Sequence, residues 1–269
     1  MSEPLIALHQ AGVAHGVVPV LVDADLTVAA GEVVVVASPA GSGATALIEL
    51  VTGQRAGTGK ICLAGRDLGR LRASSLTRLR RRLGIIPEDL VLAEGATALA
   101  NVEVALEIVG VARRARAETA RAALAAVEVE ADVPVARLGR AARQRVAWAR
   151  AFVREPDILI ADQPSSYQDP AGTALLVDQL TARAAAGGAA LVASRDPALV
   201  AAAAARGWRT LTIHAHRLVD PATVLETLDA TGLIEAEIER PSAADAADAA
   251  DAIPNVVQFP LARSAGHRR

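Results

Sequence analysis

Residues 37–46 read Ala-Ser-Pro-Ala-Gly-Ser-Gly-Ala-Thr-Ala, and this stretch decides the fold. Before it, residues 32–36 form an apolar, β-branched run that is typical of a buried strand. After it, residues 47–51 are apolar and helical in pattern. A strand, a glycine-containing turn and a helix in direct succession indicate a loop whose backbone N–H groups converge on an anion at the start of the helix.

The loop follows the phosphate-binding pattern G-x-x-x-x-G-K-[ST], but it has lost the lysine. Ser38 stands at the first glycine and Gly43 at the second. Ala44 replaces the lysine, and Thr45 keeps the hydroxyl. The sequence therefore predicts a nucleotide-binding fold whose chemistry has been altered or abandoned.

Apolar runs of the same kind recur at residues 157–161, 190–193 and 210–213. Helical patterns separate these runs, so we predict an α/β fold with a mostly parallel sheet and crossover helices. Residues 101–150 are rich in Ala, Arg and Glu and lack long β-branched runs, which predicts an inserted helical subdomain.

Composition excludes several classes of protein. The chain has 269 residues, enough for one large or two modest cores. Its net charge of −2 gives no general attraction to nucleic acid, so we expect no nucleic-acid partner. Cys62 is the only cysteine, which excludes a disulfide framework within the chain, and we expect it to be buried on a strand. Residues 4–22 lack charge but contain glycine, histidine and proline, so they predict neither a membrane helix nor a signal peptide.

Several segments resemble, in order and spacing, the motifs of the ATP-binding cassette (ABC) ATPases. They are a strand lead-in at 28–32, the phosphate loop at 38–46, a Q-loop at 83–89, a signature at 138–147, a Walker B motif at 158–164, a D-loop at 168–170 and a switch at 193–196. Residues 89–106 look most like the macrolide-exporter and lipoprotein-release branch. The resemblance implies a P-loop NTPase core, an N-terminal antiparallel β-subdomain and a helical subdomain at about 88–150.

The resemblance also assigns roles to positions, and most of the catalytic ones are replaced. The lysine that binds the β- and γ-phosphates is Ala44, and the Q-loop glutamine that touches the metal and the attacking water is Glu88. The Walker B glutamate, which acts as a base or positions the water, is Gln163, and the switch histidine is Arg195. Intact catalytic residues are therefore absent from these positions.

The remaining positions of the family site are partly kept. The signature Ser-Gly-Gly, which closes over the partner subunit's γ-phosphate, is Gly139-Arg140-Ala141, and His15 stands where an aromatic stacks on adenine. Thr45 and Asp162 are retained as the positions that would hold Mg²⁺. The nucleotide-binding positions are Ser38, Pro39, Ala40, Gly41, Ser42, Gly43, Ala44, Thr45 and Ala46.

These replacements have physical consequences. Without the lysine, the γ-phosphate charge is less compensated, so ATP and Mg²⁺ are expected to bind more weakly. Gln163 cannot accept a proton from water, and loss of a positioned base costs about 10²–10⁴-fold in rate. The changes in charge nearly cancel, so we predict that Arg195 reaches Asp162 or Glu88; the alternative is that Arg195 is solvated or pairs with Asp196.

The leading interpretation is a degenerate ABC nucleotide-binding subunit, cytoplasmic and peripheral at the inner face of the cell membrane. It would contact a membrane permease through the groove between the Q-loop and the helical subdomain, as a homodimer or as a heterodimer with another cassette. Two alternatives stay open: a non-catalytic interaction or regulatory protein on this fold, and an active ATPase with non-standard residues. Residues 1–240 would form the cassette, and residues 241–269, which include an Ala/Asp repeat, are expected to be disordered.

Overall fold

An antiparallel sheet carries the N-terminal part of the chain. The computed structural model describes residues 3–37 and 39–224. The strands of this sheet, in spatial order, are β2 (Val18–Val28), β1 (Ile6–His15), β4 (Thr58–Leu63) and β5 (Arg66–Asp67). Adjacent strands all pair antiparallel, which confirms the predicted β-subdomain. Gly16 lies in the turn between β1 and β2 with a φ of 63°, a conformation that glycine adopts without strain.

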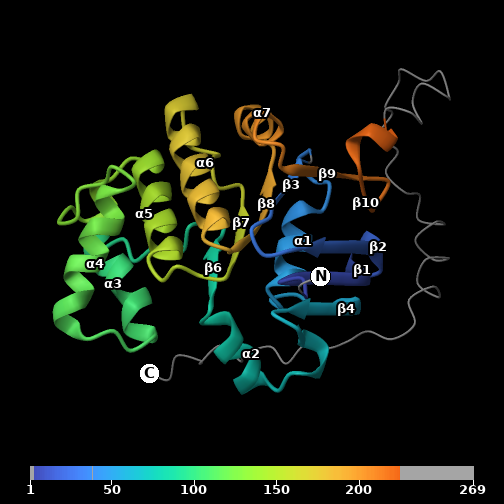
Figure 1. Ribbon diagram of the computed structural model, residues 1–269, viewed down its shortest axis with the longest axis horizontal. Helices are drawn as coiled ribbons and strands as arrows, with labels where there is room; N and C mark the ends of the chain where they lie inside the picture. Colours follow the sequence, from blue (N-terminus) through green and yellow to red (C-terminus); the bar gives the residue numbers. More distant parts are fainter. Residues whose placement is uncertain (1–2, 38, 225–269) are drawn as a thin grey trace.

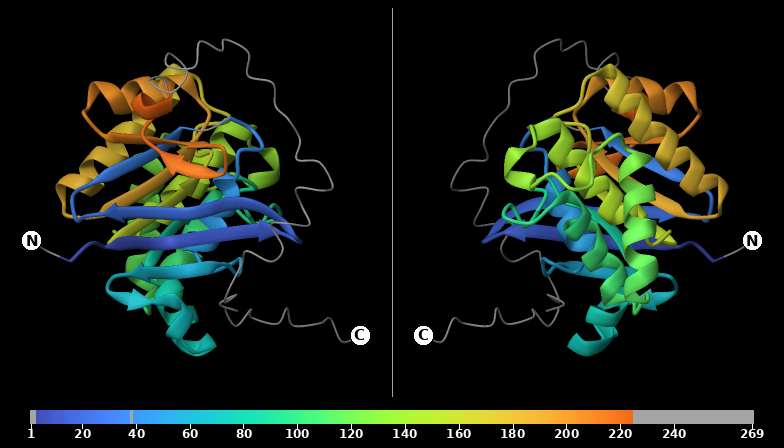
Figure 2. Two further views of the ribbon diagram at one scale, coloured as in Figure 1. Left: turned by 90° about the vertical axis from the view of Figure 1, so that its right-hand side faces the viewer. Right: turned by 90° about the vertical axis from the view of Figure 1, so that its left-hand side faces the viewer.

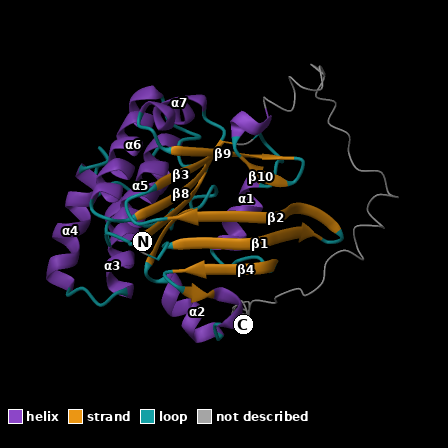
Figure 3. Cartoon of the chain, turned by 45° about the vertical axis from the view of Figure 1, so that its right-hand side comes forward, coloured by secondary structure: helices purple, strands orange, loops and turns teal. Residues whose placement is uncertain are grey.

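The second sheet is parallel except at one edge. Its strands, in spatial order, are β10 (Arg217–Val219), β9 (Arg209–His214), β3 (Val33–Ala37), β8 (Ala189–Ser194), β7 (Ile158–Asp162) and β6 (Leu83–Ile86). Only β10 pairs antiparallel, with β9, among the described strands of this sheet. The apolar runs predicted as strands fall on β3, β7, β8 and β9, so the predicted parallel sheet is confirmed. Figure 3 shows β2, β1 and β4 side by side, with the β9–β10 hairpin next to β2.

The helices pack between and around the two sheets. They are α1 (Ala44–Val51), α2 (Ala73–Arg80), α3 (Ala98–Ile108), α4 (Arg113–Ala125), α5 (Arg140–Phe152), α6 (Pro170–Ala185) and α7 (Pro197–Ala205), with 3-10 turns at Leu68–Arg70 and Val135–Arg137. Helices α3, α4 and α5 gather at one end of the molecule, and the N-terminal sheet lies at the other (Figures 1 and 2). These three helices form the predicted helical subdomain, and its exact boundaries stay a prediction.

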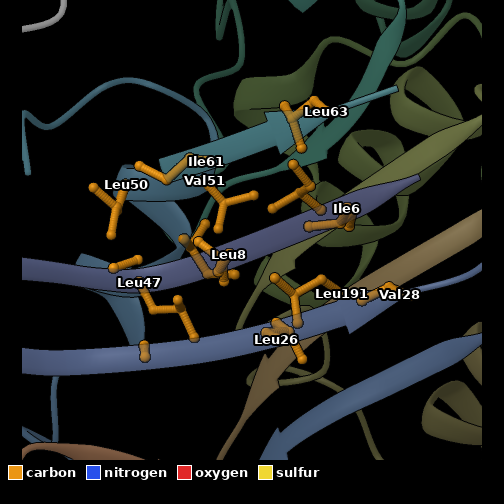
Figure 4. Packing of buried hydrophobic residues seen from close by; sticks show 14 of the residues in the cluster. Ile6, Leu8, Leu26, Val28, Leu47, Leu50, Val51, Ile61, Leu63 and Leu191 are labelled. Atoms are coloured by element: carbon orange, nitrogen blue, oxygen red, sulfur yellow. The ribbon is translucent and has the colours of Figure 1, made fainter. Parts of the chain in front are cut away.

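Helix α1 lies between the two sheets. Leu47, Leu50 and Val51 of α1 point toward β1, β2 and β4 in Figure 4. The same cluster of buried side chains includes Val34 and Val36 of the central strand β3. Packing on both sides therefore holds the helix that follows the phosphate loop. Because the loop is joined to this helix, the same packing positions the loop.

Both faces of the parallel sheet are buried, which explains why its strands are apolar without a break. Along β3, Val34 and Val36 face α1 and the N-terminal sheet, whereas Val33 and Val35 belong to the buried cluster on the other face, where α6 and α7 contact β3. The two-residue period of a strand sends alternate side chains to opposite faces. The sheet therefore separates two apolar cores and leaves its strand ends for polar groups.

Cys62 lies on β4 as predicted, but it is only half-buried, because Ile61 and Leu63 take the inward positions and Cys62 points the other way.

The tail predicted to be disordered from Pro241 lies outside the described residues. Among the residues that are described, we find no helix with the length and apolar character needed to cross a bilayer.

Candidate functional site

Four replaced family positions, Ala44, Glu88, Gln163 and Arg195, meet at one edge of the parallel sheet. The phosphate loop follows β3, Glu88 follows β6, Gln163 follows β7 and Arg195 follows β8. Register brings these loops together, since Ala37 pairs with Ser194 across β3 and β8, and β7 lies next along. Ligand sites of α/β sheets form at the carboxyl ends of the strands. The topology thus gathers residues from four separate parts of the sequence.

The phosphate loop depends on its glycines. Gly41 and Gly43 have φ values of 79° and 100°, in the region that other residues reach only with strain. A Cβ on Gly43 would lie 2.6 Å from Cγ1 of Val20 and 3.1 Å from the Val20 carbonyl oxygen. Gly43 is also the N-cap residue of α1, and no described side chain caps this end. The first-turn N–H groups therefore have no side-chain cap among the described residues and can bind an anion.

A pocket of about 240 Å³ opens beside the loop. It is lined by Pro39, Ala40, Gly41, Gly43, Ala44, Thr45, Ala46, Glu49, Arg55, Gln163 and Arg195. Ser42 is absent from this lining, and its hydroxyl is buried with no hydrogen-bond partner in the described part of the chain. Ser38 lies outside the described residues. The other predicted loop residues thus border one space, and the side chain of Ala44 brings no charge to it.

Asp162 and Thr45 fit a magnesium ion. Asp162 ends β7 and is 3% exposed, and its Oδ1 is buried without a hydrogen-bond partner among residues 3–37 and 39–224. The pKa of this carboxyl is raised to about 6, chiefly by burial. A hydrogen bond from Thr45 and the charge of Arg195 lower the pKa, whereas the charges of Glu88 and Glu49 add to the increase. A buried, unpartnered carboxylate oxygen next to a hydroxyl offers the hard oxygen donors that Mg²⁺ prefers. Bound there, Mg²⁺ would neutralise phosphate charge.

Gln163 is held in an orientation that does not suit a base. Its φ is 49°, and its side-chain Oε1 accepts a hydrogen bond of 3.1 Å from the backbone N–H of Arg195. A backbone N–H can only donate, so the amide oxygen is engaged and the amide NH₂ is the end left for other contacts. An NH₂ group can donate to a water molecule but cannot take its proton.

Arg195 forms the ion pair that its charge change predicted. Its Nη2 lies 3.0 Å from Oε1 of Glu88, which confirms Glu88 as the partner rather than Asp162. Asp196 is used elsewhere: its carboxylate accepts hydrogen bonds from the Ala198 N–H and the Thr173 hydroxyl. The Arg195–Glu88 pair joins the ends of β8 and β6, the strands on either side of β7. It therefore lies across the end of β7, where Gln163 follows.

A second ion pair in the pocket was not predicted. Nε of Arg55 lies 2.5 Å from Oε2 of Glu49, and both side chains are about one-third exposed. Glu49 follows Thr45 by four residues on α1, so the two share a helix face. That spacing is the only signal in the sequence for Glu49, and none points to Arg55. The pocket thus contains two guanidinium groups, each paired with a glutamate.

The signature and adenine positions lie outside this pocket as the described residues define it. Gly139 is the N-cap residue of α5 and offers no capping side chain, and the guanidinium of Arg140 stacks over the ring of Tyr167, 5.3 Å from its centroid. The carbonyl of Ala141 accepts a hydrogen bond from Gln168. His15 ends β1 and is exposed. None of these residues lines the pocket of the same chain, and their family roles stay predictions.

Helix α5 is tied to the loop that follows β7. The Gln144 amide donates to the carbonyl of Gln163 at 3.0 Å and accepts from the backbone N–H of Tyr167 at 3.2 Å. Nε1 of Trp148 donates to the carbonyl of Pro164 at 2.9 Å. Both Gln144 and Trp148 are buried. These bonds fix the main chain beside the pocket to the helix that presents the signature position.

Curated bacterial proteins with sequences similar to this chain include two methionine import ATP-binding proteins. A methionine import ATP-binding protein MetN of Rhizobium johnstonii is 33% identical over 175 residues, which cover 64% of this chain and 48% of that protein. A MetN 2 protein of Paraburkholderia xenovorans is 35% identical over 156 residues, covering 57% of this chain and 40% of the relative. The matched region thus spans about half the length of these curated relatives or less.

A solved structure and a family model agree with these relatives. The dimeric structure of MJ0796, described as a bacterial ABC transporter cassette, matches with a TM-score of 0.72 and 25% identity over 79% of this chain and 96% of that chain. The family model described as ABC transporter matches residues 21–166, more than half of the chain. This match covers the phosphate loop, the helical subdomain and β7. The chain belongs to the ABC transporter family.

Proposed function

We propose that this chain is an ABC nucleotide-binding subunit that binds ATP but hydrolyses it at or near background. The hydrogen bond from the Arg195 N–H to Oε1 of Gln163 carries this proposal. This hydrogen bond engages the amide oxygen of Gln163, so only the NH₂ group is left for other partners. The family has a glutamate at this position, whose carboxylate oxygen could accept a proton. Phosphoryl transfer relies on positioning and charge compensation, and the chain also lacks the loop lysine at Ala44.

What remains of the site supports binding. The glycines of the loop keep their left-handed conformations, and no side chain in the described part of the chain caps the N–H groups at the start of α1. Asp162 and Thr45 offer oxygen donors for Mg²⁺. The fold and a nest of backbone N–H groups need no lysine to attract phosphate. Binding and hydrolysis are therefore separable in this chain.

We also propose that the subunit works in an assembly with a membrane permease and a second cassette. The MJ0796 cassette was solved as a dimer, and the MetN relatives are described as import proteins. Arg140 stands at the exposed start of α5, where the family contacts the partner's nucleotide, and it is bulky where the family has glycine. ATP-dependent activity would then need a separate catalytic cassette. Membership of the macrolide-exporter and lipoprotein-release branch is part of this proposal.

The test is a titration of the purified protein with Mg-ATP, together with a phosphate-release assay. The Ala44→Lys variant should bind ATP more tightly, because lysine compensates ground-state charge, but its turnover should stay near background. Thr45→Ala is the control for activity from the site. A turnover of about 1 s⁻¹ that disappears in Thr45→Ala would show an active ATPase and overturn the proposal.

A further inference from the structure

Two arginines reach the phosphate loop from different directions, and neither belongs to the motif. Arg195 comes from the end of β8, and Arg55 comes from the segment after α1. Both line the pocket beside Thr45. Glu88 and Glu49 hold their guanidinium groups at 3.0 and 2.5 Å. The pocket therefore lacks the family's lysine at Ala44 but contains two arginines from outside the loop.

The backbone directs Arg55 toward the loop. Its N–H donates to the carbonyl of Glu49 at 3.1 Å, so the chain folds back on α1 after the helix ends. Its guanidinium meets the carboxylate of Glu49, one helical turn beyond Thr45. The side chain, one-third of which is exposed, therefore runs back along α1 to the pocket that Thr45 also lines.

Guanidinium groups suit this position chemically. A guanidinium offers a planar fork of N–H donors that matches two oxygens of a phosphate or a carboxylate. Glu49 binds Nε of this fork with the same kind of oxygen that a phosphate would bring. The Glu49 carboxylate therefore competes with a phosphate for the guanidinium of Arg55.

We propose that Arg55 supplies the phosphate-binding cation that the loop has lost at Ala44, with Arg195 as a second cation and Glu49 as an internal competitor. The ligand class is a nucleoside di- or triphosphate, whose terminal phosphates exchange places with the Glu49 carboxylate on Arg55. This inference rests on the proposed nucleotide-binding function. It predicts opposite effects for the two members of one ion pair, since Arg55 favours the ligand and Glu49 opposes it.

The experiment is a calorimetric titration of the full chain with ATP and with AMP. Arg55→Gln should weaken ATP binding by about 10-fold or more, as expected for a lost charge-assisted hydrogen bond, and Arg55→Lys should recover part of the loss. Glu49→Gln should tighten ATP binding. AMP, which lacks the terminal phosphates, should respond to none of these changes.

Arg206→Gln is the matched control. Arg206 pairs with Asp178 at 2.8 Å and is 34% exposed, close to the 33% of Arg55, but it lies on the segment after α7 and does not line the pocket. It should leave ATP binding unchanged. Circular dichroism would show whether each variant is folded; if Arg55→Gln is not, Glu49→Gln decides alone, because its predicted effect has the opposite sign.

The outcomes separate this inference from the function on which it rests. If the unaltered chain binds ATP and Glu49→Gln binds it no more tightly, Arg55 is not the substitute cation, while the nucleotide-binding function stands. The same holds if a folded Arg55→Gln variant binds ATP like the unaltered chain. If neither the unaltered chain nor Glu49→Gln binds ATP at millimolar concentration, both the inference and the binding function are wrong.

Discussion

Replacing Asp162 by asparagine should stabilise the protein at neutral and alkaline pH. Asp162 is 3% exposed, and its Oδ1 has no hydrogen-bond partner in the described structure. Burial raises the pKa of its carboxyl from 3.8 to about 6. The ionised side chain therefore costs free energy in the folded state that a neutral amide of the same size does not.

The magnitude follows from the two pKa values. A raised pKa means that the folded state binds the proton more tightly than the unfolded state. The stabilising contribution of the carboxyl is fully present below pH 3.8 and is lost as the pH rises through about 6. Each pKa unit corresponds to about 1.4 kcal/mol, so ionisation costs up to about 3 kcal/mol. Asp162→Asn should therefore be up to about 3 kcal/mol more stable than the unaltered chain at pH 8 and nearly equal to it at pH 4.

Urea unfolding at pH 4 and pH 8, with EDTA present and nucleotide absent, measures this difference. Asp178→Asn is the control, because Asp178 is an exposed carboxylate in a surface ion pair and should change the stability by less than about 1 kcal/mol at either pH. A gain for Asp162→Asn that is the same at both pH values, or no gain at pH 8, would refute the reasoning from burial.

Three further substitutions test the pocket and its support. In the Ala44→Lys background, Gln163→Glu should raise ATP turnover by about 10²-fold, because the new carboxylate keeps one oxygen for the Arg195 N–H and presents another to water; unchanged phosphate release would argue against this orientation. Gly43→Ala should lower the stability by about 1–3 kcal/mol, since its φ is 100° and its Cβ would meet Val20, and an unchanged melting temperature would contradict that. Trp148→Phe should cost about 1–3 kcal/mol in urea unfolding through the unpaired carbonyl of Pro164, and a cost below about 0.5 kcal/mol would show that the bond contributes little.

The strands could be predicted because burial on both faces leaves a strong pattern. Residues 32–36 are apolar at nearly every position for the reason that Val33 and Val34 face different cores. The phosphate loop was predictable because its glycines and its place between strand and helix are local features. Cys62 was harder, since the alternation along β4 shows which residues share a face but not how well each face is covered.

The pocket was only partly predictable. The charge changes at family positions predicted that Arg195 would reach Asp162 or Glu88, and the structure shows Glu88. Arg55 did not, because its side chain returns to the loop after the chain has passed the whole of α1, and no sequence spacing encodes that return. The orientation of the Gln163 side chain could not be predicted either, because it depends on a left-handed backbone conformation at this one residue.

The attachment of α5 to the loop after β7 has a mechanical consequence. Because Gln144 and Trp148 bind the main chain of that loop, a displacement of α5 would be passed to the loop. The exposed start of α5, at Arg140, is then linked through the helix and these bonds to the backbone of Gln163. A protein that presses on the start of α5 would shift the pocket wall without touching it, so control of the nucleotide could be exerted from the outer surface of the cassette.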